Sequence, residues 1–160
     1  MTAQQPRVIV VGIDGSPASI NALRWAIREA AATRGHVKAV HAWHYLPEPT
    51  SIMLSPPRAT RDDEERWARI LLDDAIQEAL SGQDVRPPIA EHLVEGDAAR
   101  ALVEAARHAD LLVVGARRHG VIRGALFGSV SQRCAEHATC PVVVVPPEAD
   151  EAPEGRPRAE

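Results

Sequence analysis

Glycines and arginines gather in one stretch of the chain, GARRHGVIRGALFGS, which covers residues 115 to 129. The stretch follows a run of valines and leads into a predicted helix. Glycine lets a backbone approach a ligand closely, and arginine supplies positive charge for phosphate or carboxylate groups. A loop that only connects two elements does not need both. The composition therefore favours a cradle for an anion, with a solvated surface loop as the alternative.

The end of this stretch has a second property that suits an anion. Ser129 and Gln132 have the spacing of a capping box, which predicts a helix that begins at about Val130. The first backbone N–H groups of a helix lack partners within the helix, and the helix dipole is positive at this end. We therefore expect Gly128 and Ser129 to face a negative charge, and Ser129 can also donate its hydroxyl.

A second candidate loop, Gly12-Ile13-Asp14-Gly15-Ser16, follows the first apolar run of the chain. Asp14 is placed where a carboxylate could accept hydrogen bonds from sugar hydroxyls; a turn in which Asp14 bonds its own loop is the alternative. A phosphate site and a sugar site together form the profile of a nucleotide. The sequence contains neither G-x-x-x-x-G-K-[ST] nor a G-x-G-x-x-G after this first run, which argues against a P-loop and a dinucleotide site.

Short apolar runs that alternate with helical patterns predict the elements that hold these loops. Such alternation indicates an α/β fold, in which a five-stranded parallel sheet lies between two layers of helices. Ligands of these sheets bind at the carboxyl ends of the strands, where both candidate loops begin. The predicted strands cover residues 8–11, 37–43, 89–94, 111–114 and 142–145.

Polar and glycine residues mark the predicted ends of the helices. Ser, Thr and Asp are favoured N-caps because their side chains accept a backbone N–H bond, and Gly35 and Gly82 are expected to end the first two helices. On the second helix, Trp67 falls in a wide apolar face that we expect to be buried. The predicted N-caps are Ser16, followed by Pro17, then Thr60 and Asp97.

Composition narrows the classes of protein. The net charge of −4, the pI of about 6.0 and the aromatic content of 3% argue against a nucleic-acid-binding protein. No apolar run reaches the roughly 20 residues that cross a membrane, and no signal peptide is visible, so we expect a cytoplasmic protein. Cys134 and Cys140 are expected to be small buried thiols, and His41 a hydrogen-bonded core histidine. The histidines form no metal set, and we nominate no catalytic residue.

The chain is expected to form one domain over residues 1–146, followed by a disordered tail over 147–160. The proline-rich segment 44–59 is too long for an ordinary connection, which predicts a lid or a disordered insert. The apolar strand Val142 to Val145 is expected at a sheet edge. Because a bare apolar edge invites aggregation, we expect it to pair with its copy in a homodimer.

From about Arg7 to Pro146 the chain resembles the universal stress protein family. The resemblance rests on VVGIDGS before a helix, on VHAW, and on GARRHGVIRGALFGSVS before CPVVVV. Nucleotide-binding members of this family carry G-2x-G-9x-G-[S/T] after the fourth strand. Gly115 fills the first position and Gly128-Ser129 the last two, but Arg118 stands at the second glycine.

The resemblance implies a regulatory protein that binds ATP, with Mg²⁺ possible, or a smaller relative such as AMP or cyclic AMP. If the backbone at Arg118 needs a positive φ, a side chain there destabilises the fold by on the order of 1 kcal/mol or more. A charge-assisted hydrogen bond from Arg118 to a phosphate, worth roughly 1.5–3 kcal/mol, could offset this cost. A nucleotide-free dimeric interaction module and a slow ATP-cleaving enzyme are the alternatives. The resemblance places Gly12, Asp14 and Ala42 (through its backbone) at the base and ribose, and Gly115, Gly128, Ser129, Val130 and Ser131 at the phosphates; charge alone adds Arg117 and Arg118.

Overall fold

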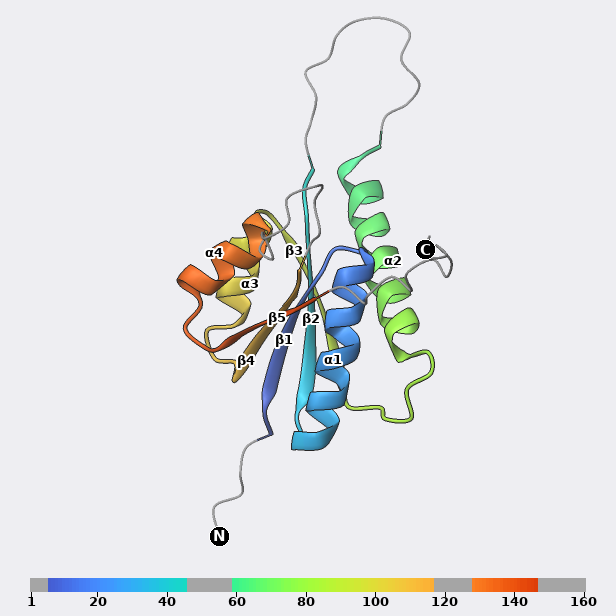
Figure 1. The fold of residues 1–160 in the computed structure, drawn as a ribbon. Coiled ribbons are helices and arrows are strands. Elements are labelled where there is room, and N and C mark those ends of the chain that lie inside the picture. The colour runs from blue at the N-terminus through green and yellow to red at the C-terminus, as the bar shows by residue number, and fades with distance from the viewer. Residues whose placement is uncertain (1–5, 46–58, 117–127, 147–160) are drawn as a thin grey trace, which may run out of the picture.

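The computed structural model describes residues 6–45, 59–116 and 128–146 (Figure 1). It confirms the α/β prediction: five parallel strands form one sheet with the order β3-β2-β1-β4-β5. The strands are β1 (Val8–Ile13), β2 (His36–Trp43), β3 (Ile89–Glu95), β4 (Leu111–Gly115) and β5 (Val142–Val145), and the helices are α1 (Pro17–Thr33), α2 (Arg61–Leu80), α3 (Ala98–Ala105) and α4 (Ser129–His137).

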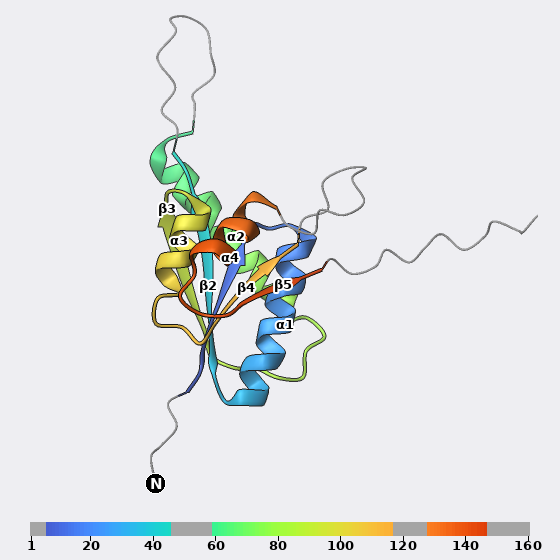
Figure 2. The same cartoon turned by 60° about the vertical axis from the view of Figure 1, so that its left-hand side comes forward.

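Helices cover both faces of the sheet, as the prediction of three layers requires. Helices α1 and α2 lie on one face, and α3 and α4 lie on the other (Figures 1 and 2). Because successive side chains of a strand point to opposite faces, Ile9 and Val11 of β1 pack in the core under α1 and α2, whereas Val10 packs in the core under α3 and α4. The central strands β1 and β4 are covered on both faces, which explains why they are continuous apolar runs, whereas the edge strand β3 is polar and more exposed.

The predicted helix starts are confirmed at three positions. The side chain of Ser16 accepts a bond from the N–H of Ser19 at the start of α1. Thr60 forms a reciprocal capping box with Asp63 at the start of α2, and Asp97 caps α3. Short polar side chains thus satisfy N–H groups that each helix leaves without internal partners.

The predicted end of α1 at Gly35 is confirmed, since the helix ends at Thr33 and the Gly35 N–H donates to the carbonyl oxygen of Ala30 at 2.8 Å, but the left-handed turn falls on the residue before it. Arg34 adopts the left-handed conformation, with φ 53°, and its N–H bonds the carbonyls of Ala30 and Ala31. Gly35 has a different role: a Cβ added there would lie 2.5 Å from the backbone oxygen of Arg7. The glycine therefore allows the chain to enter β2 close against the start of β1. The predicted end of α2 is confirmed, because Gly82 follows the helix with φ 73°.

The prediction that Trp67 belongs to the buried face of α2 is wrong. Trp67 is 56% exposed and Ile70 is 50% exposed. The buried stripe begins one residue later, at Ala68, and continues through Leu72 and Ala75 toward α1 and the sheet. A helix packed against another helix and a sheet buries a stripe about 100° wide, and Trp67 falls outside it.

The remaining predictions concern the two cysteines, strand β5, the proline-rich segment and the tail. Cys134 is fully buried and Cys140 is partly buried, as expected of small thiols. Strand β5 lies at the edge of the sheet beside β4, and its pairing with a second copy stays a prediction. The segments predicted as a lid and as a tail fall largely outside the described residues. No helix of the described part is long and apolar enough to cross a membrane.

Candidate functional site: a pocket at the carboxyl ends of the strands

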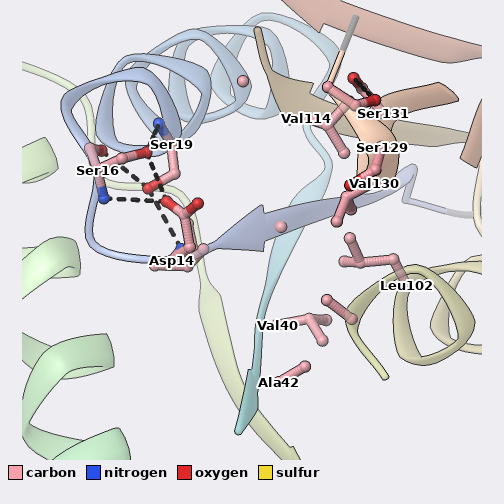
Figure 3. A pocket seen from close by; sticks show the side chains of 15 residues that line it. Asp14, Ser16, Ser19, Val40, Ala42, Leu102, Val114, Ser129, Val130 and Ser131 are labelled. Atoms are coloured by element: carbon pink, nitrogen blue, oxygen red, sulfur yellow. Dashed lines mark hydrogen bonds between the residues drawn. The ribbon is translucent and has the colours of Figure 1, made fainter. Parts of the chain in front are cut away.

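A pocket of about 160 Å³ lies where the winding of the sheet reverses. The chain runs outward from β1 to β2 and β3, then returns to place β4 on the other side of β1. The connections that leave β1 and β4 consequently start in opposite directions, and a crevice lies at the carboxyl ends of these two strands, as expected for a doubly wound sheet. Its lining, drawn in Figure 3, comprises Gly12, Ile13, Asp14, Ser16, Ser19, Val40, Ala42, Ala98, Leu102, Val114, Gly115, Gly128, Ser129, Val130 and Ser131.

The loop after β1 holds Asp14 through bonds within the loop itself. Asp14 Oδ1 accepts bonds from the backbone N–H of Ser16 at 2.9 Å and from the Ser16 hydroxyl at 2.5 Å (Figure 3). The Ser19 hydroxyl donates to the carbonyl oxygen of Ser16 at 2.9 Å. The alternative in which Asp14 bonds its own loop is therefore what the structure shows. These bonds fix the carboxylate at the rim of the pocket, where its lone pairs can also meet a ligand.

The histidine predicted as a core residue supports this loop from the other face of the sheet. His41 is buried, and its Nδ1 lies 2.8 Å from the carbonyl oxygen of Ile13, the residue before Asp14. Because that oxygen can only accept, Nδ1 carries the proton of this hydrogen bond. The bond connects the end of β1 to β2 at the point where the loop begins.

Apolar side chains form the pocket wall opposite Asp14. Val40 and Ala42 come from β2, and Leu102 comes from α3 (Figure 3). Gly12 lies against this wall: a Cβ added there would lie 2.8 Å from Leu102 Cδ1. Because Gly12 has no side chain, Leu102 can pack directly against the backbone of β1. The apolar wall therefore has no side chain protruding at this position, which suits a flat apolar group such as a base.

The glycine that opens the predicted anion loop has a structural reason to be glycine. A Cβ added at Gly115 would lie 2.5 Å from the backbone oxygen of Ala18 and 2.9 Å from the N of Ser19. These are backbone atoms of the first turn of α1, and they cannot move aside as a side chain could. The end of β4 thus touches the start of α1, which brings the two loops together.

The predicted capping box at α4 is wrong. The N-cap is Gly128, Ser129 is the first helical residue, and no side chain caps this end. Gln132 instead bonds Glu136 at 2.9 Å, and the Ser131 hydroxyl donates to the carbonyl of Gly128 at 3.0 Å. From the described residues, no hydrogen-bond acceptor reaches the N–H groups of Ser129 or Val130. These donors and the Ser129 side chain line the pocket, so the end of α4 can bind an anion.

An ion pair fixes α4 against α3 beside the pocket. Arg133 lies 2.9 Å from Asp97, which also accepts the N–H of Arg100 as the cap of α3. The hydrogen bond from Arg133, and then that from the Arg100 N–H, lower the pKa of Asp97. On the inner side of α4, burial raises the pKa of the Cys134 thiol to about 11, which keeps it protonated at neutral pH. A protonated thiol packed in the core is not a nucleophile for this site.

The structure gathers the predicted binding residues in one place. Every one that lies among the described residues lines the pocket, whereas Arg117 and Arg118 lie outside them. Sequence reasoning missed the contributions of Ser19, Val40 and Leu102. The position of Val40, two residues before Ala42 on one strand face, was a usable signal. Leu102 offered none, because an apolar residue on a helix is most often a core residue. The residues gathered in the pocket are Gly12, Asp14, Ala42, Gly115, Gly128, Ser129, Val130 and Ser131.

The described lining of the pocket provides hydrogen-bond donors, the carboxylate of Asp14 and an apolar wall. In the part of the chain that the structure describes, no group of three or more histidine, cysteine, aspartate or glutamate residues is placed to hold a metal ion. The arrangement favours recognition of a small molecule that combines a flat apolar group, hydroxyls and a negative charge.

Comparisons with known proteins agree with this geometry. The family model described as the universal stress protein family matches residues 6–146. Universal stress protein Rv2623 of Mycobacterium tuberculosis is 35% identical over an alignment of 150 residues, and the match covers 86% of this chain and 46% of that protein. The chain therefore spans about half the length of this curated relative.

Solved structures show the same likeness. A universal stress protein solved in complex with cyclic AMP is 30% identical to this chain, with a TM-score of 0.66. The match covers 89% of this chain and 98% of the solved one. A protein of the same family from Burkholderia pseudomallei is 30% identical, covers 87% and 95%, and has a TM-score of 0.59. The sequence motifs, the parallel sheet and these matches lead to one conclusion: the chain belongs to the universal stress protein family.

Proposed function

We propose that the chain is a regulatory protein that binds an adenine nucleotide in the pocket between the loops after β1 and β4. The observation that carries the proposal is the start of α4, which has no side-chain cap. It lines the same pocket as Asp14 and the apolar wall. The solved relative in complex with cyclic AMP, at 30% identity, supports a nucleotide as the ligand.

Each part of the pocket suits one part of a nucleotide. The base would lie against Val40 and Leu102, with the backbone of Ala42 available for hydrogen bonds to its edge. The carboxylate of Asp14 would accept bonds from ribose hydroxyls. A phosphate would lie at the N–H groups of Ser129 and Val130, where the partial positive charge of the helix end favours an anion.

The solved relative bound to cyclic AMP, at 30% identity, favours a small nucleotide. AMP or cyclic AMP places less phosphate at α4 than ATP does, so we propose one of these as the preferred ligand. ATP with Mg²⁺ is the second candidate, and its outer phosphates would need Arg117 or Arg118, which lie outside the described residues.

Nucleotide binding would act as a signal. The ligand would join the β1 loop to α4, two segments far apart in the sequence, and so favour one arrangement of this surface for a protein partner. We propose that the protein works as a homodimer through β5, because β5 leaves a row of backbone groups at the sheet edge.

The direct test is thermal and chemical unfolding with AMP, cyclic AMP, and ATP with and without Mg²⁺. A ligand present at 100 times its Kd should stabilise the folded protein by about 2.7 kcal/mol. We expect AMP or cyclic AMP to do so at lower concentration than ATP. No stabilisation by any of the nucleotides would contradict the proposal, and sustained release of phosphate or pyrophosphate would indicate an enzyme instead.

Gly128→Val is the matching variant. Gly128 has φ −76° and ψ 169°, a conformation that valine adopts without strain, so the protein should fold. The branched side chain would occupy the place proposed for phosphate, and ligand stabilisation should disappear. Ser81→Val is the control, because Ser81 is an exposed cap with extended backbone at the far end of α2. Retained binding in Gly128→Val would place the ligand elsewhere.

A further inference from the structure

We propose that an open groove beside Trp67 binds an apolar peptide segment with basic side chains, contributed by a partner protein. The groove has a volume of about 410 Å³ and runs between α2 and the loop after β1. It is separate from the nucleotide pocket, although Asp14 borders both. Its lining comprises Asp14, Gly15, Ile20, Trp67, Ile70, Leu71, Asp74, Ala75 and Glu78.

Large apolar side chains stand exposed at this groove. Three large hydrophobic residues of the described chain are exposed, and two of them, Trp67 and Ile70, border it at 56% and 50% exposure. They lie one helical turn apart on α2, while Leu71 and Ile20 continue the surface down into the core. A tryptophan beside such a depression is typical of a binding surface, because aromatic side chains carry much of the energy of interfaces.

The fold does not require these side chains. The buried stripe of α2 consists of Ala68, Leu72 and residues further along the helix, all turned toward α1 and the sheet. Trp67 and Ile70 lie outside that stripe. Exposed apolar area on a helix already fixed by other residues is consistent with a partner that covers it.

The charges around the groove select the occupant. Asp74 and Glu78 follow Trp67 along the same side of α2, and Asp14 lies across from them. Within the described residues, no ion pair joins Asp74 to a cation, and Arg24 reaches the Glu78 carboxylate only at 4.0 Å. A segment with arginine or lysine next to its apolar side chains would therefore match the groove, whereas an acidic one would be repelled.

The arginines of α2 near the groove do not reverse this selection. Arg66 lies 3.6 Å from Asp63, and Arg69 lies 3.3 Å from Glu65. Both pairs lie within α2 itself, so each positive charge is balanced by a neighbour on the same helix. Asp74 and Glu78 are the acidic groups of the groove that an incoming segment would meet.

The groove and the nucleotide pocket share one loop. Gly15 has φ 77°, and a Cβ added there would lie 3.2 Å from Leu71 Cδ1, so the loop packs closely on the groove wall. The neighbouring Asp14 borders the nucleotide pocket. A nucleotide that fixes this loop would change the affinity of the groove for its peptide, and the peptide would change nucleotide affinity by the same factor. This coupling rests on the proposed function, whereas peptide binding does not.

The test uses the full chain without nucleotide and a short fluorescein-labelled peptide in which pairs of leucines are separated by arginines. Fluorescence anisotropy measures its Kd. One control peptide replaces the arginines with glutamates, and another replaces the leucines with serines. We expect only the first peptide to bind with a saturable curve. Failure to bind, or equal binding of either control, would overturn the proposal.

Variants locate the binding. Trp67→Ser should weaken the peptide Kd about tenfold or more, because it removes the central apolar contact. Asp74→Asn should weaken it about twofold to fivefold, as expected for a rim charge. Val85→Ser is the matched control, since Val85 is the third exposed hydrophobic and lies at another surface; it should leave the Kd unchanged. Equal affinity of Trp67→Ser and Val85→Ser would place the peptide elsewhere.

Two further measurements complete the test. Sedimentation of the parent chain and of Trp67→Ser shows whether a second copy covers the groove; a dimer that dissociates on substitution would overturn the peptide proposal. Repeating the peptide titration with saturating AMP, in a sample whose AMP binding is shown by the melting shift, measures the coupling. A changed Kd supports the shared loop as the connection, and an unchanged Kd overturns the coupling alone.

Discussion

The loop after β1 and the start of α4 line one pocket, but their polar groups are satisfied differently. In the β1 loop, Asp14 and Ser16 bond each other, and Ser16 caps α1. On the other side of the pocket, α4 begins directly after Gly128, and no side chain caps its first turn. The β1 loop thus forms its hydrogen bonds without a ligand, whereas the start of α4 leaves backbone donors at the pocket.

This difference separates stability from binding. A substitution of Ser16 in the β1 loop should affect mainly the folded state, because it breaks bonds that exist without ligand. A substitution at the start of α4 should affect mainly affinity, because the bonds it removes form only with a ligand. Gly115, where the end of β4 contacts α1, belongs to both regions and should have the largest effect.

Gly115→Ala should lower the free energy of unfolding by about 1–3 kcal/mol, the range for overpacking. The added Cβ would lie 2.5 Å from the backbone oxygen of Ala18, which cannot rotate away. Urea denaturation measures the change. Gly12→Ala is the comparison, since its Cβ meets only the movable side chain of Leu102 and should cost less than about 1 kcal/mol. Equal losses would mean that β4 and α1 can separate freely.

Ser129→Ala should weaken nucleotide binding about tenfold and leave the unfolding free energy within roughly 0.5 kcal/mol of the parent. Among the described residues the Ser129 side chain caps no helix end, so we expect its hydroxyl to matter mainly to a ligand. Isothermal titration with AMP measures the affinity. Gln132→Ala, one turn further along α4, is the control and should bind normally. A large loss of stability in Ser129→Ala would show that the serine has a structural bond after all.

Ser16→Ala should lower the unfolding free energy by about 1 kcal/mol, the usual cost of losing an N-cap. The serine accepts the N–H of Ser19 and donates to Asp14, and alanine does neither. Ser16→Asn, which keeps a capping oxygen, should recover most of the loss in the same urea experiment. If alanine and asparagine behaved alike, the cap would contribute nothing.

Asp97→Asn should produce the smallest change, and only in acid. The folded protein holds the pKa of Asp97 below its usual value, so the carboxylate contributes stability above the unfolded pKa near 3.9 and loses it as pH falls through the folded pKa. Asparagine retains the cap of α3 but not the charge toward Arg133. The acid limb of the stability curve should therefore become shallower, with little change near neutral pH. An unchanged acid limb would show that the ion pair has no energetic role.

The two loops also differ in how far they could be predicted. Ser16 and Asp97 were identified as caps because capping depends on local chain geometry, which short sequence patterns report. The capping box at Ser129 failed because two residues at the right spacing do not fix which one begins the helix; here Gly128 does. Trp67 was misplaced because α1 and the sheet, distant in sequence, decide which stripe of α2 is buried.

The order of elements, the strand segments and the residues of the glycine motif could be derived from local patterns, since periodicity and turn chemistry act over a few neighbours. The contact of Gly115 with α1, the Leu102 wall and the exposed groove at Trp67 depended on folding. These features form where segments tens of residues apart come into contact. The packing of helices on a twisted sheet determines which segments are in contact. The sequence by itself therefore determined the residue types, whereas the tertiary packing determined that they lie together at one site.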